Sequence, residues 1–453
     1  MFVAVTGGTG FLGAHTVRAL LRHGHRVRLL ARRPDRVAAA LAPLGIAPEQ
    51  VDVVPGDVTD PAAAARLVSG VDGLLHAAGV YTFDPRRRAE LRRVNEHGTE
   101  VVLAAARAAG VARIVHVSTV GTLYPAAAPS IGPGTPPGSS REPYLASKTA
   151  AERIAGEYGA TITRPPALLG PHDPHLGDQN ARLRDLLRGL MPLWPTGGLP
   201  LGDVRDNAEL HARLFDGVDG TEFFGPGTFV TTREYLAAVR EVTGRRLPAA
   251  FFPARALTVA GRAADVLQRC WPGRLPVQYG AIHVCAVAVP VEPAAPSAGV
   301  VARPLAETLA DTVRWLAGSG ALAPRRAGRA VAGFGAAAGV PARPAAEVAA
   351  PAAGVAAQAI DLGVPASVAE VSAQAAGPGV PAPAAEVSAR PAGVAGSAPA
   401  GVPARPGASA AAGVPARQAD SVPGSAPHDR EALSSTAPPA GPAGSGATGK
   451  ALP

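Results

Sequence analysis

Short apolar runs alternate with segments of helical periodicity over the first part of the chain. Strands are predicted at residues 2–6, 26–31, 51–54, 71–76, 112–118 and 161–164, each a short and largely apolar run. Helices are predicted at 11–23, at 85–109 and around 144–152. Such strands, joined through helices, are typical of a parallel sheet that is covered on both faces. The pattern therefore predicts an α/β fold with a doubly wound parallel sheet.

The pattern loosens after Pro171. Helices predicted at 178–188, 233–243 and 304–316 are separated by irregular stretches that contain Pro and Gly. From about residue 321 onward, Ala, Pro, Gly, Val and Ser dominate, and Phe334 is the single aromatic residue. Such a segment cannot bury enough side chain to offset its backbone entropy. We therefore expect a core domain over 1–171, a smaller C-terminal substrate lobe with some core elements over 172–320, and a long disordered tail over 321–453.

Composition and charge argue against several classes of partner. The net charge is +8, yet the arginines are scattered and form no basic stripe interleaved with aromatic residues, so nucleic-acid binding is not expected. Cys270 and Cys285 form no CxxC motif, which argues against a disulfide scaffold. The chain opens directly into a strand-like run, and no apolar run is long enough to span a bilayer. We expect a cytoplasmic protein with no membrane partner; a homodimer stays open, and the partner of the tail is unknown.

A glycine-rich turn follows the first predicted strand. Gly7 allows a tight turn, Gly10 lets the backbone approach a pyrophosphate, and Gly13 lets the following helix pack close to the sheet. The free N–H groups at the start of that helix can then meet negative phosphates. A glycine triplet between a strand and a helix, at the head of repeated β-α units, predicts that residues 1–171 form a dinucleotide-binding Rossmann core.

The end of the second strand distinguishes the two nicotinamide dinucleotides. An acidic residue there would bind the ribose hydroxyls of NAD, whereas here the strand leads into Arg32 and Arg33. Guanidinium groups suit the additional phosphate of NADP, so NADP is favoured. Asp35 follows shortly after, so NAD stays an alternative, as does a reading of both arginines as solvated surface charges.

Candidate catalytic groups lie on a predicted helix and at a strand end. Tyr144 and Lys148 form a YxxxK motif, and residues four apart on a helix share one face. A nearby cation favours the phenolate and lowers the tyrosine pKa from its free value near about 10, which makes Tyr144 a usable acid/base. Ser118 and Thr119 end the fifth strand, at the sheet edge where ligands bind, and either hydroxyl could bond the reacting oxygen. Surface positions for these side chains are the alternative.

The segment His172-Asp173-Pro174-His175 has the look of a metal site. The prolines on both sides of His172-Asp173 favour ordinary loop chemistry, so no metal site is expected.

Together these motifs resemble the extended short-chain dehydrogenase/reductase family, of the NAD-dependent epimerase/dehydratase type. The resemblance covers residues 1 to about 320 and is strong through Pro171. The dihydroflavonol reductase and 3β-hydroxysteroid dehydrogenase branch is the most similar. Further segments that match the family are Gly56-Asp57-Val58, His76-Ala77-Ala78-Gly79, Val94-Asn95-Glu96-His97-Gly98-Thr99 and Arg164-Pro165-Pro166-Ala167-Leu168-Leu169-Gly170-Pro171.

The resemblance implies roles for individual residues. Tyr144 would donate or accept a proton, Lys148 would hold the nicotinamide ribose, and Thr119 would orient the substrate oxygen, with Ser118 as the alternative. The residues implied in cofactor binding are Gly7, Thr9, Gly10, Phe11, Leu12, Gly13, Arg32, Asp57, Val58, Ala77, Ala78, Gly79, Lys148 and Pro165.

Three functions follow from these expectations. The first is an NAD(P)-dependent oxidoreductase that reduces a ketone or aldehyde, or oxidises an alcohol, by hydride transfer. The second is a nucleotide-sugar epimerase or dehydratase; dehydratases of this family tend to place Asp-Glu after the active-site Thr, whereas Val120-Gly121 follow here. The third is a non-catalytic NADP-binding regulatory protein, which typically loses the tyrosine that this chain keeps.

Overall fold

The computed structural model describes residues 1–254 and 279–331. Its centre is a seven-stranded, entirely parallel sheet with the strand order β10-β6-β5-β4-β1-β2-β3. This confirms the predicted doubly wound α/β fold, and the six predicted strands are all present. The strands are β1 (Phe2–Thr6), β2 (Arg26–Ala31), β3 (Val51–Pro55), β4 (Gly73–His76), β5 (Arg113–Val117), β6 (Thr161–Arg164) and β10 (Glu222–Phe224).

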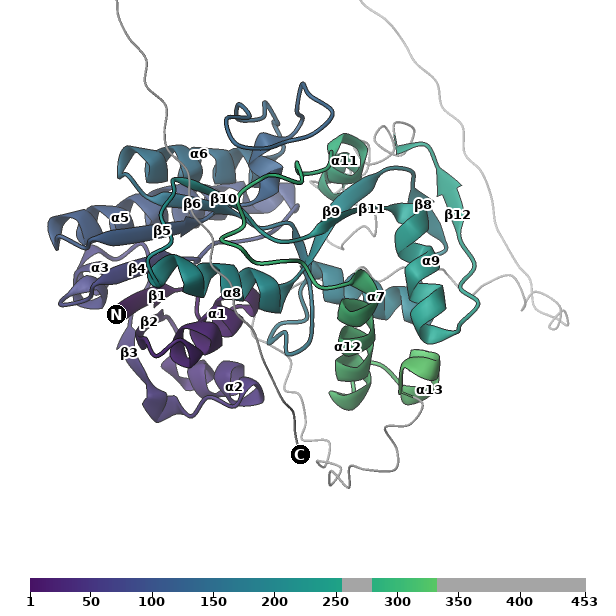
Figure 1. Cartoon of the computed structure of the whole chain (residues 1–453), viewed down its shortest axis with the longest axis horizontal. Coiled ribbons are helices and arrows are strands. Elements are labelled where there is room, and N and C mark those ends of the chain that lie inside the picture. The colour runs from purple at the N-terminus through teal and green to yellow at the C-terminus, as the bar shows by residue number, and fades with distance from the viewer. Residues whose placement is uncertain (255–278, 332–453) are drawn as a thin grey trace, which may run out of the picture. The chain divides into compact units, whose positions relative to one another are not determined.

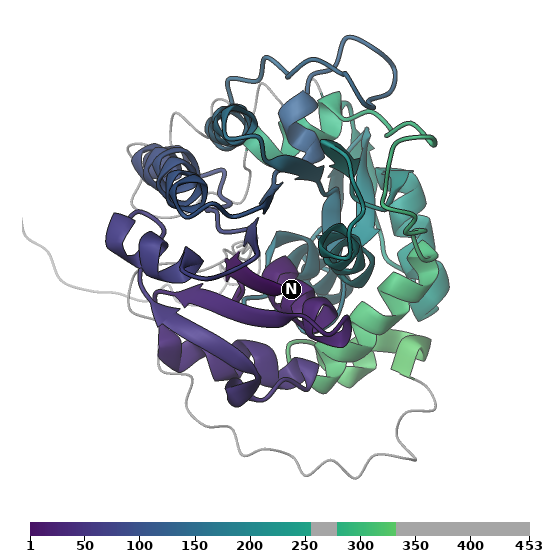
Figure 2. The same ribbon diagram turned by 60° about the vertical axis from the view of Figure 1, so that its left-hand side comes forward.

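Helices cover both faces of this sheet (Figures 1 and 2). Side chains alternate between the faces along each strand, so Val3 and Val5 enter one apolar core while Ala4 enters the other. The first core is closed by α1 (Phe11–Arg22), α2 (Val37–Leu41) and α8 (Val204–Phe215). The second is closed by α3 (Pro61–Val68), α5 (Gly98–Ala108) and α6 (Pro143–Glu157).

The chain beyond Pro171 contributes to the sheet domain and also builds a third apolar core. Strand β10 pairs with β6, and α8 packs beside α1. The third core gathers two small sheets, β7-β9-β11 and β8-β12, with the helices α7, α9 and α12. The bounds are β7 (Ala167–Leu169), α7 (Asp178–Arg188), β8 (Leu193–Pro195), β9 (Gly198–Asp203), β11 (Thr228–Thr231), α9 (Thr232–Thr243), β12 (Ala250–Phe252), α11 (Tyr279–Val287) and α12 (Leu305–Gly318).

The described fold continues past the boundary expected at residue 320. Helix α13 (Pro324–Ala327) and a 3-10 turn, η7 (Gly328–Val331), follow α12. Leu322 and Ala327 are fully buried in the third apolar core, so these residues belong to the fold and not to a tail. Small apolar side chains sufficed to anchor this segment, which composition alone did not indicate. The remainder of the expected tail, from residue 332, lies outside the described residues.

The single helix predicted over 85–109 is wrong. The chain there forms a 3-10 turn (η4, Pro85–Arg87), the short helix α4 (Arg88–Leu91), a π-helical turn (η5, Arg92–His97) and then α5. The π turn contains the buried Asn95, whose side-chain amide donates to the Val80 carbonyl and accepts from the Val80 N–H. A π turn in a helix often marks a functional position, and here it carries the amide that fixes the loop after β4.

An ion-pair network joins α8 to α12 beside the third core, where Arg205 of α8 pairs with Asp311 of α12 at 2.7 Å. Asp203 begins α8 and pairs with Arg205, while Asp206 pairs with Arg303 at 2.6 Å. Arg303 also lies 3.4 Å from Asp203, whose side chain has no solvent exposure. Removing one partner of a buried ion pair leaves an uncompensated charge. Arg303 is therefore the cation that pairs with Asp206, and it shares Asp203 with Arg205.

We expect Arg303→Ala to lower the free energy of unfolding by about 3 kcal/mol because it leaves Asp206 buried without its cation. Arg314→Ala is the control, since the pair of Arg314 with Asp311 is more exposed and should contribute less than about 1 kcal/mol. Urea denaturation at constant m-value measures both. Equal losses for the two variants would contradict this account of the network.

Candidate active site

The glycine-rich turn between β1 and α1 is shaped by close backbone contacts. Gly7 has φ +74°, and a Cβ placed on it would lie 2.7 Å from the Ala77 carbonyl. A Cβ on Gly13 would lie 2.1 Å from the carbonyl oxygen of Gly7. Gly10 is the N-cap of α1 and offers no side chain to its N–H groups. The turn therefore presents bare backbone and a helix start, which is what a pyrophosphate requires.

The loop after β4 lies against this turn. The hydroxyl of Thr6 accepts from the Ala78 N–H at 3.1 Å, which fixes the segment Ala77-Ala78-Gly79 beside Gly7. Phe11, Leu12, Ala77, Gly79 and Pro165, all predicted cofactor residues, line one pocket here. The glycines and these apolar positions thus fit a dinucleotide.

Asp57, a predicted cofactor residue, follows β3 between two arginines. Its carboxylate accepts from the N–H and hydroxyl of Thr59, and Arg32 and Arg93 each lie 3.9 Å away. Hydrogen bonds from Thr59 and the two positive charges outweigh burial and lower the pKa of Asp57. Val58 packs against Gly98, because a Cβ on Gly98 would lie only 2.8 Å from a methyl carbon of Val58. The Arg33 side chain instead pairs with Asp35 at the surface.

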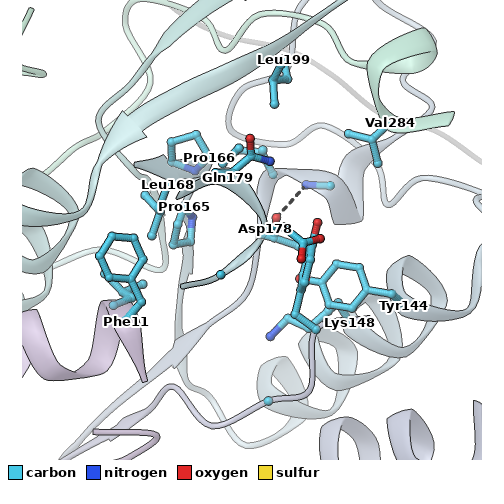
Figure 3. Close-up of a pocket in the computed structure, with 18 of the residues that line it drawn as sticks. Phe11, Tyr144, Lys148, Pro165, Pro166, Leu168, Asp178, Gln179, Leu199 and Val284 are labelled. Carbon is cyan, nitrogen blue, oxygen red and sulfur yellow. Dashed lines mark hydrogen bonds between the residues drawn. The ribbon is translucent and has the colours of Figure 1, made fainter. Parts of the chain in front are cut away.

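The catalytic candidates Tyr144 and Lys148 on α6 line one pocket (Figure 3), and Thr119, two residues after β5, lines the same pocket. Glu142 caps the start of α6 by accepting from the Leu145 N–H at 2.8 Å. Tyr144 and Lys148 lie one helical turn apart, and both line the pocket together with Thr119. The Lys148 ammonium donates to the Val117 carbonyl at 2.7 Å, two residues before Thr119. This bond ties the helix to the strand end and brings the three predicted side chains to the same cavity.

Ser118 and Thr119 have different surroundings. The Ser118 hydroxyl donates to Glu152, which in turn pairs with Arg164 at 2.6 Å in a buried network. The Thr119 hydroxyl accepts from the Gly121 N–H at 3.2 Å and begins a 3-10 turn, η6 (Val120–Leu123). Within the described residues its proton has no acceptor, whereas that of Ser118 is already donated. The geometry therefore favours Thr119 as the hydroxyl available to a ligand.

Burial governs the ionisation of both members of the YxxxK motif. It raises the pKa of Tyr144 above its ordinary value, and the negative charges of Glu142 and Asp178 raise it further. Burial also lowers the pKa of Lys148 to about 8, an effect that Glu152 opposes. The expectation that Lys148 lowers the pKa of Tyr144 is thus wrong, since burial and two carboxylates dominate. Tyr144 is a neutral phenol, able to donate a proton.

Aromatic rings surround the Tyr144 phenol. Tyr81 and Phe83, on the loop after β4, pack edge-on against it with ring centroids 4.7 and 5.8 Å away. Asn95 holds this loop through Val80 and also donates to the Ser147 hydroxyl at 3.0 Å, one residue before Lys148. Neither Tyr81 nor Phe83 is part of a predicted site. Their position three and five residues after the His76-Ala77-Ala78 segment was the available signal.

The pocket holds a cavity of about 380 Å³. Its walls come from the sheet edge, from α6, from the first turns of α7, from the start of β9 and from α11. Asp178 and Gln179 of α7 form a polar wall (Figure 3), to which Arg182 also belongs, and no sequence motif predicted it. Leu199 and Val284 form an apolar wall from more distant segments. The segment His172-Asp173-Pro174-His175 forms a loop in which the Asp173 carboxylate accepts hydrogen bonds from the N–H groups of His175 and Gly177.

Two comparisons establish the family. Residues 3–221 match the family model described as the NAD dependent epimerase/dehydratase family. A protein from Methylococcus capsulatus named sterol demethylase protein B is 31% identical over 286 residues, which cover 61% of this chain and 85% of that protein. The chain belongs to the NAD-dependent epimerase/dehydratase family. The resemblance to extended short-chain dehydrogenases/reductases is confirmed.

Other members of this family show its range. The 2-alkyl-3-oxoalkanoate reductase of Stenotrophomonas maltophilia is 32% identical over 295 residues, 60% of this chain and 84% of that protein. A dTDP-glucose 4,6-dehydratase from Streptomyces venezuelae, solved with NAD bound, is 25% identical with a TM-score of 0.55, covering 72% of this chain and 99% of that one. The epimerase/dehydratase family thus places the chain among NAD(P)-dependent enzymes. Across residues 1–254 and 279–331, no helix has the length and apolar character needed to cross a bilayer.

We expect Gly13→Ala to weaken dinucleotide binding more than about tenfold, because its methyl group would push the Gly7 carbonyl out of the turn. Gly156→Ala is the matched control, since a Cβ at that position in α6 meets nothing within 4 Å. The control should bind as wild type and gain up to about 1 kcal/mol of stability. Fluorescence titration with NADPH and NADH measures the effect; unchanged affinity in Gly13→Ala would place the pyrophosphate elsewhere.

Proposed function

We propose that the chain is an NADP-dependent oxidoreductase that reduces a ketone or aldehyde, with Tyr144 as the proton donor. The observation that carries this proposal is the meeting of Tyr144, Lys148 and Thr119 at one cavity beside the glycine turn. A carbonyl oxygen placed there can accept from the phenol and from the threonine hydroxyl. Oxidation of the corresponding alcohol is the reverse reaction at the same groups.

Each of the three side chains has one task in this scheme. Burial keeps Tyr144 protonated, so it can give its proton to the oxygen as negative charge develops. Thr119 orients that oxygen through a hydroxyl proton that has no acceptor within the described structure. Lys148, held by the Val117 carbonyl, would hold the nicotinamide ribose. The dinucleotide, when bound, supplies the hydride.

Reduction is favoured over epimerisation or dehydration by residues and by relatives. Val120-Gly121 follow Thr119, where dehydratases of the family tend to place Asp-Glu, and both residues are buried. Two relatives matched over 84% and 76% of their length, and others matched over less than half, have names of a reductase or dehydrogenase; the shorter matches include a ceramide reductase and a 3 beta-hydroxysteroid dehydrogenase/isomerase. A sugar-nucleotide dehydratase is a structural neighbour, so sugar turnover without net redox change is the second candidate.

NADP is the proposed cofactor because Arg32 stands at the end of β2 with its side chain half exposed. Its contact with Asp57 is long, at 3.9 Å, which leaves the guanidinium able to reach an additional ribose phosphate. Relatives solved with NAD show that NAD itself is compatible with the fold of this family.

We expect Tyr144→Phe to lower kcat for carbonyl reduction by about 100-fold or more, because it removes the proton donor. The cofactor Kd should change little. Tyr158→Phe, at the end of the same helix and outside the pocket, is the matched control and should keep full activity. NADPH oxidation at 340 nm with a panel of ketones and aldehydes measures both. Retained turnover in Tyr144→Phe would remove this residue from the chemistry.

We expect Arg32→Ala to weaken NADPH binding by about tenfold or more and to leave NADH binding unchanged, because a charge-assisted phosphate contact is lost. Arg36→Ala, an exposed arginine four residues later, is the control and should affect neither cofactor. Equal loss of NADPH and NADH affinity in Arg32→Ala, or no loss at all, would contradict the preference for NADP.

A further inference from the structure

One wall of the pocket differs from the rest in carrying charge. Most of the lining is apolar, with Leu199, Val284 and Pro166 among the residues that face the cavity (Figure 3). Helix α7 begins at this cavity and contributes Asp178 and Arg182, which are one helical turn apart. Neither residue belongs to the predicted catalytic or cofactor set.

Arg182 has no polar partner in the described structure. Its Nε is buried and makes no hydrogen bond, and no ion pair involves its guanidinium within residues 1–254 and 279–331. The other cation in the lining, Lys148, is held by the Val117 carbonyl. A buried, charged donor without a partner is costly, and native structures rarely keep one without a reason. Arg182 is thus the lining cation that is free to receive a ligand.

The surroundings of Arg182 do not neutralise it. Two acidic residues of α7 lie about one helical turn from it: Asp178 forms no ion pair with Arg182 and accepts a hydrogen bond from Tyr81, and Asp185 pairs with Arg184 at 2.7 Å. Burial raises the pKa of Asp178, which weakens it as a counter-ion. The positive charge of Arg182 also acts on the buried Cys285 of α11 and Tyr235 of α9, both neutral groups. Among the residues that the structure describes, the guanidinium therefore lies between α7, α9 and α11 without an anionic partner.

We propose that Arg182 binds a carboxylate of the substrate, so that the substrate is an apolar oxo acid. This rests on the proposed function for the carbonyl at Tyr144 and adds the group at the other end of the molecule. A guanidinium binds a carboxylate through two parallel hydrogen bonds. The cavity of about 380 Å³ is shared with predicted cofactor residues such as Phe11 and Gly79, so the mostly apolar room left for a substrate suits a compact acyl chain better than a nucleoside diphosphate. Arg182 would thus set specificity and orient the carbonyl toward Tyr144.

Binding of redox-inert probes tests the anion site independently of any turnover. Octanoate, octyl phosphate and 1-octanol are titrated by calorimetry into the full chain saturated with NADPH. Octanoate should bind about tenfold or more weakly to Arg182→Met than to wild type, with Arg182→Lys in between, whereas 1-octanol should not distinguish them. Arg188→Met, on the exposed last turn of α7, is the matched control and should bind octanoate as wild type.

Two binding results would overturn the proposal. Octanoate affinity that is the same in wild type and Arg182→Met, with both proteins folded by circular dichroism, would show that Arg182 holds no anion. Octyl phosphate that binds more tightly than octanoate, in a way that depends on Arg182, would replace the carboxylate with a phosphate.

Kinetics with a matched substrate pair then separates this proposal from the proposed function. Wild type should reduce 3-oxooctanoate with a lower KM than its methyl ester, and Arg182→Met should raise KM for the acid alone, with kcat little changed. Equal effects of Arg182→Met on acid and ester would overturn the carboxylate contact and leave the reductase in place. Failure of every carbonyl to oxidise NADPH, alongside octanoate binding that depends on Arg182, would overturn the reductase and leave the anion site in place.

Discussion

The site depends on a single tie between a helix and a strand end: the Lys148 ammonium donating to the Val117 carbonyl. Strand β5 ends at Val117 and leads directly into Ser118 and Thr119, while Tyr144 lies one turn before Lys148 on α6. A cation buried in this position must have a hydrogen-bond acceptor, because an unpaired buried charge is strongly unfavourable. The carbonyl of β5 meets that need. In doing so it fixes which hydroxyl and which phenol share the cavity.

The same burial that makes this tie necessary sets the chemistry of the tyrosine. In water a lysine beside a tyrosine would favour the phenolate. Here the low dielectric of the pocket raises the pKa of Tyr144, and the carboxylates of Glu142 and Asp178 act in the same direction. Burial also lowers the pKa of Lys148 to about 8, so Lys148 loses its proton at a lower pH than a surface lysine does. A neutral phenol beside a weakened ammonium is suited to giving a proton to a carbonyl oxygen.

Local features of the sequence predicted much of the fold, and tertiary contacts decided the rest. The strands of the central sheet and the glycine turn are visible in short windows, because apolar runs and glycines at fixed spacing depend on near neighbours. The π turn at Asn95 was not visible, since it depends on the backbone of Val80 across a loop. The pairing of β10 with β6 was likewise hidden, because β10 is three residues long and joins the sheet from 58 residues farther along the chain.

The site divides in the same way. Tyr144, Lys148 and Thr119 carry a motif, whereas Tyr81 and Arg182 reach the cavity only because the loop after β4 and helix α7 converge on it. The proposed reduction requires that the pocket hold Tyr144 as a neutral proton donor. An NMR pH titration of protein labelled with ¹³Cζ-tyrosine, with Tyr144→Phe assigning the resonance, tests it directly. We expect Tyr144 to stay un-ionised up to at least about pH 10 in the free protein. Titration of that resonance near neutral pH would contradict it.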